Sequence, residues 1–132
     1  MSDGAVLSLM LAVPDAAAAA AWYKEALGAT ELWNLGTIVG LEVRGAALFL
    51  AQPGGGWRHP EAAECTTVRV EVFLDDPDPF IARAVRAGAK EGPDGTRDHQ
   101  RPWGRHRQGG FTDPFGHIWL VGDKSPLVRH PA

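Results

Sequence analysis

Residues 7–29, LSLMLAVPDAAAAAAWYKEALGA, decide the fold, because their pattern recurs in residues 68–89, VRVEVFLDDPDPFIARAVRAGA. Each stretch begins with an alternating apolar run that reaches an aspartate, and a helix-forming segment then ends at a glycine. The two helical spans, Asp15 to Gly28 and Asp75 to Gly88, have the same length. A unit present only twice is too short for a solenoid, which needs at least ~3 repeats. Two copies instead predict a pseudo-symmetric sheet with a concavity between them.

The segments after each helix predict further strands. We expect strands at residues 7–13, 30–34, 37–43 and 46–51 with a helix at 15–27, then strands at 66–74, 89–91, 108–112 and 117–122 with a helix at 79–87. Residues 92–107 are expected to form a loop, since Gly92, Pro93 and Gly95 interrupt the preceding strand. The chain is therefore predicted to be one α+β domain over residues 1–132, with module one at about 5–52, a linker at about 53–65, module two at about 66–123 and a tail at 124–132.

The composition is typical of an ordinary globular protein, with 132 residues, 45% hydrophobic and 22% charged. A net charge of −3 argues against nucleic acid as a partner, because phosphate binding uses a basic face. The single cysteine, Cys65, cannot form an intramolecular disulfide and so implies no oxidising compartment. The apolar stretch at 5–13 is too short to span a membrane, and residues 1–4 lack the positive charge of a secretion signal. We therefore expect a cytoplasmic protein with neither a membrane nor a nucleic acid as partner.

Two groups of residues resemble those of a known superfamily. In the first copy Trp22-Tyr23 precedes Leu27-Gly28-Ala29, and in the second Trp103-Gly104 is followed by Phe111-Thr112-Asp113-Pro114-Phe115-Gly116-His117-Ile118-Trp119. Together with two strand–helix–strand–strand–strand (βαβββ) modules, they resemble the vicinal oxygen chelate superfamily over residues 7–122, and within it the glyoxalase/bleomycin-resistance protein branch. The resemblance implies that the modules form a pseudo-symmetric open-barrel sheet with flanking helices, and that the site lies in its cavity.

Enzymes of this superfamily typically hold a divalent metal on side chains from the first and last strands of each module. The matching positions here are Ser8, Arg69 (Val68 if the register shifts by one), Phe49 and Leu120. None is a histidine or a carboxylate, which are the donors that a divalent ion needs. No pair among the five histidines has the i, i+4 spacing of a helical metal site. The chain is therefore predicted to hold no metal and to need no cofactor.

Five tryptophans are many for a domain of this size. Trp22 and Trp119 follow structural patterns and are predicted to lie in the core. Trp33, Trp57 and Trp103 have no such pattern. An indole that faces a cleft offers a stacking surface for a planar ligand, worth about 0.5–1.5 kcal/mol per aromatic pair. A surface or interface role for these three is the alternative.

Polar residues near the expected cleft allow two interpretations. Arg69 and Glu71 lie on the face of a central strand that would look into the cleft, where they either pair with each other or bind polar groups of a ligand. A locally basic run contains Arg97, His99, Arg101, Arg105, His106 and Arg107. It forms either a solvated rim or a cover over the cleft that attracts an anionic or phenolate ligand.

These observations favour a metal-independent binding protein of the bleomycin-resistance type. It would sequester a small aromatic antibiotic or metabolite in a cleft shared between the protomers of a homodimer. The predicted ligand-binding residues are Phe49, Arg69, Glu71, Trp103 and His106, with Trp33 and Leu120 as further candidates, and no catalytic residue is predicted. One alternative is a glyoxalase- or dioxygenase-like enzyme, with a displaced metal or none, in which Glu71 or His106 is the general base. Another is a dimeric scaffold or regulatory module without a ligand.

Overall fold

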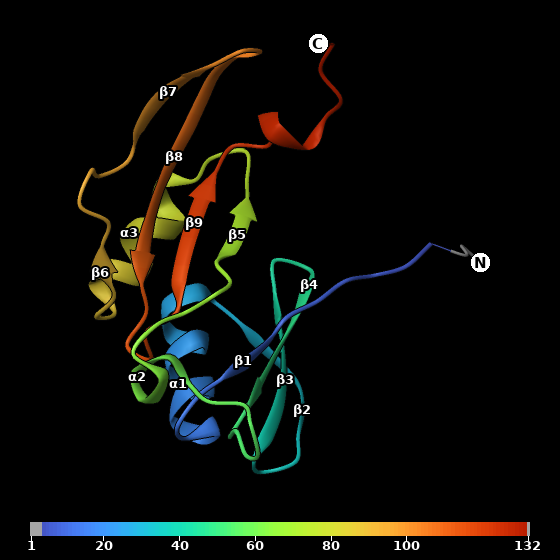
Figure 1. The fold of residues 1–132 in the computed structure, drawn as a ribbon. Helices are drawn as coiled ribbons and strands as arrows, with labels where there is room; N and C mark the ends of the chain where they lie inside the picture. Colours follow the sequence, from blue (N-terminus) through green and yellow to red (C-terminus); the bar gives the residue numbers. More distant parts are fainter. Residues whose placement is uncertain (1–3, 132) are drawn as a thin grey trace.

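The computed structural model describes residues 4–131 and contains two separate β-sheets (Figure 1). The first sheet has the order β1-β4-β3-β2 and is formed by β1 (Met10–Ala12), β2 (Thr30–Asn34), β3 (Ile38–Val43) and β4 (Ala46–Ala51). Strand β1 runs parallel to β4, and the other neighbours are antiparallel. The α+β fold built from two repeated units, predicted from the sequence, is therefore confirmed.

The second sheet repeats this arrangement and extends it by one strand. It has the order β5-β9-β8-β6, with β7 paired to the free half of β8. Its strands are β5 (Val70–Phe73), β6 (Lys90–Glu91), β7 (Arg97–Arg101), β8 (Gly104–Thr112) and β9 (Ile118–Gly122). Strand β5 runs parallel to β9, as β1 does to β4. The two sheets are therefore pseudo-symmetric copies of one connectivity.

Two helices cover one face of the sheets, and local signals in the sequence set their ends. Helix α1 (Ala16–Leu27) follows Asp15, whose carboxylate accepts hydrogen bonds from two backbone N–H groups of the first turn. It ends at Gly28, which has a φ of 69° that glycine adopts without a steric penalty. Helix α3 (Asp78–Arg86) occupies the same place in module two. Two shorter elements are α2 (Pro60–Ala63) and the 3₁₀ helix η1 (Ser125–Leu127). No helix among residues 4–131 is long and apolar enough to cross a membrane.

A buried carboxylate joins the two modules. Asp113 is 4% exposed, and its Oδ2 accepts hydrogen bonds from the hydroxyl of Tyr23 on α1 and, at 3.0 Å, from the indole Nε1 of Trp119 on β9. Its Oδ1 accepts from the backbone N–H groups of Phe115 and His117, at 2.9 and 3.0 Å. The Tyr23 ring also packs 5.9 Å from that of Trp119. Burial and then the neighbouring charge of Asp113 raise the pKa of Tyr23, so the phenol stays a hydrogen-bond donor.

Three segments differ from the sequence predictions. The first strand is shorter than residues 7–13, because only 10–12 pair with β4. Residues 4–7 form an arm that projects from the body (Figure 1), here called the N-terminal arm, while Ser8 and Leu9 hydrogen-bond to β4. The expected loop at 92–107 is wrong, because 97–101 and 104–112 form a long β-hairpin. The tail at 124–132 is also more ordered than the expected extension, since η1 lies within it.

Each sheet has a face toward the helices and an opposite face, here called its outer face. In the second sheet Val70, Phe111, Trp119 and Val121 belong to the core, so the alternating residues Glu71, Gln108, Gly110, Thr112, Ile118 and Leu120 lie on the outer face. In the first sheet Leu41, Leu48 and Leu50 belong to the core, and Met10, Gly40 and Phe49 lie on the outer face. Both outer faces are therefore available to a ligand or a partner.

Replacing Asp113 tests the link between the modules. An Asp113→Asn variant should lose about 2–4 kcal/mol of unfolding free energy, because the amide nitrogen cannot accept a hydrogen bond and faces two donors. Urea denaturation monitored by tryptophan fluorescence measures this change. Asp76→Asn, on an exposed carboxylate, should shift the free energy by less than about 0.5 kcal/mol. Equal effects of the two substitutions would contradict the proposed link.

Candidate ligand-binding site

A cavity of about 290 Å³ lies over the outer face of the second sheet. Strands β8 and β9 form its floor, and the segment between β6 and β7 forms one wall. The lining residues that matter here are Gly92, Asp94, His99, Gln108, Gly110, Thr112, Ile118 and Leu120. We call this space the outer-face pocket. Its apolar floor with a few polar groups at the margin is typical of a small-molecule site.

The strand registers show which positions of the two sheets are equivalent. Phe49 of β4 is paired with Met10 on one side and Gly40 on the other. Leu120 of β9 is paired in the same way with Glu71 and Gly110. On both outer faces, the central apolar residue is thus paired with a glycine of the neighbouring strand.

The residue beside this glycine, on or just after the next strand, differs between the two sheets. In the first sheet it is Trp33, which is paired with Gly40 and stacks on Phe49 with 5.6 Å between ring centroids. The indole lies so close over Gly40 that an added Cβ would come within 2.6 Å of it. In the second sheet the position is Gly92, whose N–H donates to the carbonyl of Gly110 at 3.0 Å. The outer-face pocket is therefore the space that an aromatic side chain fills in the other module.

The floor of this pocket can be formed only by glycine. A Cβ on Gly110 would lie 2.4 Å from the carbonyl oxygen of Trp119, so a larger residue would force the strand to move. By contrast, a Cβ on Gly92 would come no closer than 3.5 Å to any neighbouring atom, which is ordinary contact. The pocket is thus open because Gly92 has no side chain, although a larger residue would fit there. Its floor is flat because only glycine fits at position 110.

The positions that hold a metal in the related enzymes do not form a metal site in this chain. Ser8 uses its hydroxyl to donate to the carbonyl of Ala47, Phe49 stacks on Trp33, and Arg69 carries a fixed positive charge. The fourth position, Leu120, offers no donor atom. Residues 4–131 contain no group of three or more histidine, cysteine, aspartate or glutamate side chains placed to share an ion. The donor chemistry therefore does not fit a divalent metal.

The seven predicted ligand-binding residues do not lie together in one site. Trp33 and Phe49 lie together on the outer face of the first sheet, and Leu120 lines the outer-face pocket. Glu71 lines a different cavity of about 220 Å³, between β5 and the β3–β4 turn. Arg69 precedes β5 and is exposed, and no salt bridge joins it to Glu71 among the residues described. All five remain predictions as ligand contacts.

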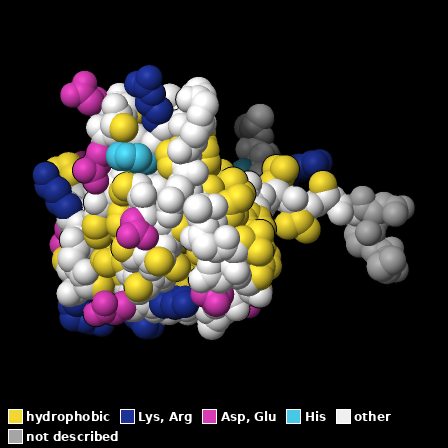
Figure 2. Space-filling model, turned by 90° about the horizontal axis from the view of Figure 1, so that it is seen from below, with side chains coloured by type: hydrophobic (Ala, Val, Ile, Leu, Met, Phe, Trp, Pro, Cys, Tyr) yellow, Lys and Arg dark blue, Asp and Glu magenta, His cyan; other side chains and the backbone are white. Residues whose placement is uncertain are grey.

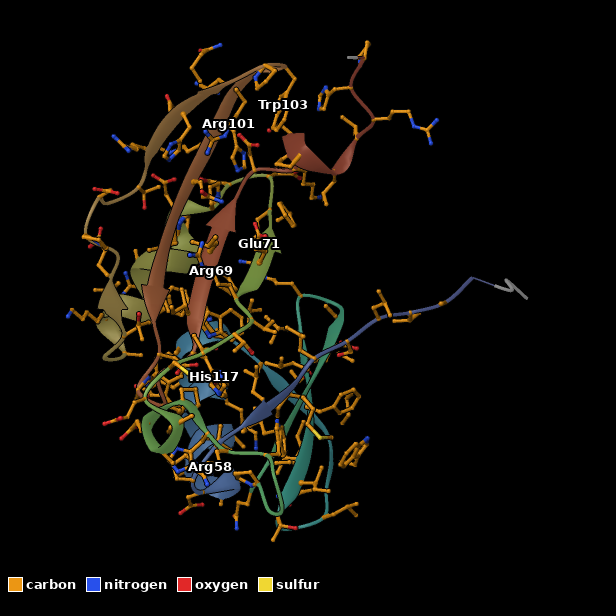
Figure 3. All side chains as sticks on the ribbon, viewed as in Figure 1. Arg58, Arg69, Glu71, Arg101, Trp103 and His117 are labelled. Atoms are coloured by element: carbon orange, nitrogen blue, oxygen red, sulfur yellow. The ribbon has the colours of Figure 1, made fainter. Side chains whose placement is uncertain are left out.

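Trp103 lies in the turn of the β7–β8 hairpin, away from Arg69 and Glu71 (Figure 3), and His106 lies on β8 opposite His99. They contact residues 123–131, which we call the C-terminal segment. The Trp103 indole donates to Ser125 Oγ at 3.1 Å and stacks on His130 with 4.8 Å between centroids. His106 is 3% exposed, and its Nδ1 lies 2.8 Å from Asp123 Oδ1. Both side chains therefore hold this segment in place.

The geometry around His106 does not form a catalytic relay. Ser125 Oγ lies 3.2 Å from Nδ1, the same ring nitrogen that faces Asp123. A serine–histidine–aspartate relay needs the serine and the aspartate on opposite ring nitrogens. The other side of the ring packs against Gly122, where an added Cβ would come within 2.7 Å of it. The cluster is therefore suited to attach the C-terminal segment.

Asp123 organises that attachment. Burial opposes its ionisation, but hydrogen bonds from the backbone N–H of Arg107, from Ser125 and from His106 outweigh this and hold its pKa below the usual range. A carboxyl whose pKa is lower in the folded state stabilises the fold above its unfolded pKa of about 3.9. This contribution is lost as the pH falls through the folded pKa.

The comparisons with known proteins agree with this geometry. Residues 8–121 match the family described as the glyoxalase-like domain. The chain belongs to this family. It lies within the glyoxalase/bleomycin-resistance group of the vicinal oxygen chelate superfamily, as its motifs predicted. An uncharacterized protein of Mycobacterium bovis is 32% identical over 127 residues, which cover 88% of this chain and 81% of the relative.

Solved structures of low sequence identity share the glyoxalase-like fold. TioX from Micromonospora sp. ML1 has a TM-score of 0.70 at 24% identity and covers 91% of this chain and 98% of its own. A glyoxalase/bleomycin resistance protein from Albidiferax ferrireducens T118 has a TM-score of 0.69 at 15% identity, covering 89% and 98%. The fosfomycin resistance protein FosX from Mesorhizobium loti has a TM-score of 0.63 at 14% identity, covering 97% and 100%.

The residues that form the outer-face pocket are mostly ones that sequence reasoning missed. The sequence predicts Gly92 only as a strand breaker, and it predicts Gln108, Gly110, Thr112 and Ile118 only as strand residues. A usable signal was present, because Gly40 and Gly110 each lie in the strand before the last strand of their copy. That signal becomes informative only when the register shows what covers each glycine.

Replacing Asp123 tests the attachment of the C-terminal segment. At pH 7 Asp123→Asn should cost about 1–3 kcal/mol of unfolding free energy, because a charge-assisted hydrogen-bond network is lost. The difference from the wild type should shrink as the pH falls from about 5 to 2, because the unfolded wild-type chain then takes up a proton at Asp123 that the folded protein resists. Urea denaturation across this range measures both effects. Asp75→Asn, whose carboxylate is 91% exposed and pairs only with Lys124, is the control and should have little effect. A difference that stays constant with pH would contradict this role for Asp123.

Proposed function

We propose that this glyoxalase-like protein is a metal-independent binding protein of the bleomycin-resistance type, which sequesters a small aromatic antibiotic or metabolite. The supporting observation is the outer-face pocket, where Gly92 stands in the position that Trp33 occupies in the first sheet. A planar ring of the ligand takes the place of the missing indole. It lies on Gly110 and against Leu120, as Trp33 lies on Gly40 and against Phe49.

The size and lining of the pocket suit such a ligand. At about 290 Å³ it is at the lower end of the usual range for ligand pockets, roughly 300–1,000 Å³, and fits one or two fused rings. Ile118 and Leu120 supply apolar contact, while Gln108 and Thr112 supply hydrogen-bonding groups at its margin. Affinity then comes from burial of the ring face, and orientation comes from the polar groups.

The side chains present support binding without chemical conversion. Ser8, Phe49, Arg69 and Leu120 replace the donors with which the related enzymes hold a metal. His106 is directed toward Asp123 and the C-terminal segment. Proteins of the same fold include a glyoxalase/bleomycin resistance protein and a fosfomycin resistance protein, and sequestration of an antibiotic is consistent with that group.

Filling the pocket with a side chain tests this function. Gly92→Trp should place an indole over Gly110 and weaken binding of planar aromatic compounds at least tenfold, a loss of about 1.4 kcal/mol. Isothermal titration calorimetry against a panel of bicyclic aromatic compounds and aromatic antibiotics gives the dissociation constants. Gly54→Trp is the control, because that glycine has open space around it and lies outside the pocket. Wild-type protein that binds no member of the panel more tightly than about 1 mM would overturn the proposal.

We propose in addition that the protein acts as a homodimer. The N-terminal arm carries Val6 and Leu7, which are 89% and 94% exposed, and Figure 2 shows apolar side chains on the projecting arm. The outer face of the first sheet exposes Met10 and Trp33 at 45% and 39%. The outer edges of β1 and β5 have no strand partner among the described residues. A second copy of the chain would cover these surfaces at once, since a two-fold interface uses the same surface twice.

Polar substitutions in the arm test the dimer. The double variant Val6→Asp/Leu7→Asp should elute as a monomer in size-exclusion chromatography with light scattering, while the wild type elutes as a dimer. The control is Leu127→Asp/Val128→Asp, which changes two apolar residues of similar exposure, 60% and 61%, in the C-terminal segment. A wild-type protein that is monomeric at 100 µM, a concentration at which a micromolar dimer would be populated, would contradict the assembly.

A further inference from the structure

The β7–β8 hairpin separates the basic run of the sequence onto two faces. Strand alternation places Arg105 and Arg107 on the face toward α3. It places Arg97, His99 and Arg101 on the outer face, where Arg97 is paired in register with Gln108 and His99 with His106. A run of charge that looks uniform in the sequence is therefore two distinct rows in the fold.

The row toward α3 is neutralised by carboxylates. Arg107 donates to both oxygens of Asp78 at 2.8 Å and to Asp98 at 3.0 Å, and Arg105 lies 3.7 Å from Asp98. Its hydrogen bonds to Asp78 and then to Asp98 raise the pKa of Arg107 above its already high value. These arginines are structural, since they join the hairpin to the start of α3.

The outer row has no such partners. Within the described residues, neither Arg97 nor Arg101 has a carboxylate oxygen within 4.0 Å. His99, which lies between them, lines the outer-face pocket next to Gln108. Figure 3 shows Arg101 near the end of the hairpin. Arg97 is in register with Gln108, which lines the pocket, so its guanidinium group lies at the pocket margin, whereas Arg101 is in register with Gly104 at the end of the hairpin, away from Gly110.

We infer that the ligand of the outer-face pocket is a planar aromatic oxyanion, such as an aromatic carboxylate, whose charged group is bound by Arg97 while its ring lies on Gly110. This inference rests on the proposed binding function and adds the chemical class of the ligand. A guanidinium fork matches the two oxygens of a carboxylate. The amide of Gln108 lies in register with Arg97 and supplies a neutral donor at the same end of the pocket.

Carboxylates on the outer face weaken its attraction for an anion, but the cations there outnumber them. Asp94 lines the pocket wall, and Glu71 lies across the sheet beside Leu120. Against these two carboxylates the outer face presents Arg97 and Arg101, together with Lys90, which is paired in register with Thr112. Because the cations gather on β6 and β7, the anionic group is directed toward that edge of the pocket and away from Glu71.

Three naphthalene probes of equal ring size test the charge preference. Naphthalene-2-carboxylate, naphthalene-2-carboxamide and 2-naphthylmethylammonium are titrated into the wild-type protein by calorimetry at low and high salt. The carboxylate should bind at least tenfold more tightly than the amide, with the ammonium weakest, and this preference should fall as salt rises. In Arg97→Gln the carboxylate and the amide should bind within about twofold of each other.

Arg105→Gln is the matched control, because it removes one arginine from the same hairpin but from the opposite face. It should keep the wild-type preference for the carboxylate. Equal binding of all three probes to the wild type would overturn the inference and leave the proposed binding function intact. No binding of any probe, together with failure of the wider aromatic panel, would overturn both. A preference that survives in Arg97→Gln would assign the anion to a different cation and contradict the role of Arg97.

Discussion

The hydrogen bonds accepted by the buried Asp113 join module one to module two. This carboxylate lies in the turn before β9, yet one of its donors is Tyr23 on the helix of the other module. Strand pairing does not join the two sheets, so one module is held against the other by this contact, by the packing of Tyr23 against Trp119, and by the hydrogen bonds of Trp22 to the Ala87 carbonyl and of His117 to the Ala12 carbonyl. A full set of donors makes the buried charge tolerable, because each oxygen has two partners.

A duplicated scaffold allows the two copies to diverge on their outer faces while their cores stay alike. In the first sheet an aromatic side chain covers the glycine floor, and in the second the same floor is open. The change depends on one position, Trp33 in one copy and Gly92 in the other. The shape of the pocket thus follows from asymmetry between the copies. The proposed preference of the pocket for an anion follows from the arginine side chains on the added strand β7.

The sequence predicted most helices and strands but failed at the β7–β8 hairpin and at the first strand. Residues 97–107 are polar on both faces, so they show no period-two alternation of apolar residues. Their strand structure comes from pairing with each other and from the ion pairs of Arg107 with Asp78 and Asp98. Residues 7–9 alternate well, but few backbone partners lie beside them within the chain. Among the predicted site residues, Leu120 lines the pocket, and the sequence predicts its strand correctly. Trp103 and His106 instead contact a C-terminal segment that no local pattern predicts.

The sequence alone determined the duplicated α+β architecture, the capped helix α1, the core faces of the strands and the family. These features depend on residues a few positions apart, through helical and strand periodicity and turn chemistry. Only the tertiary structure decided that Gly92 is equivalent to Trp33, that Arg97 and Arg101 lack the carboxylates that bind Arg107, and that His106 is covered. Those facts depend on which residues lie opposite one another across strands and between modules, and that register arises from packing distant segments together.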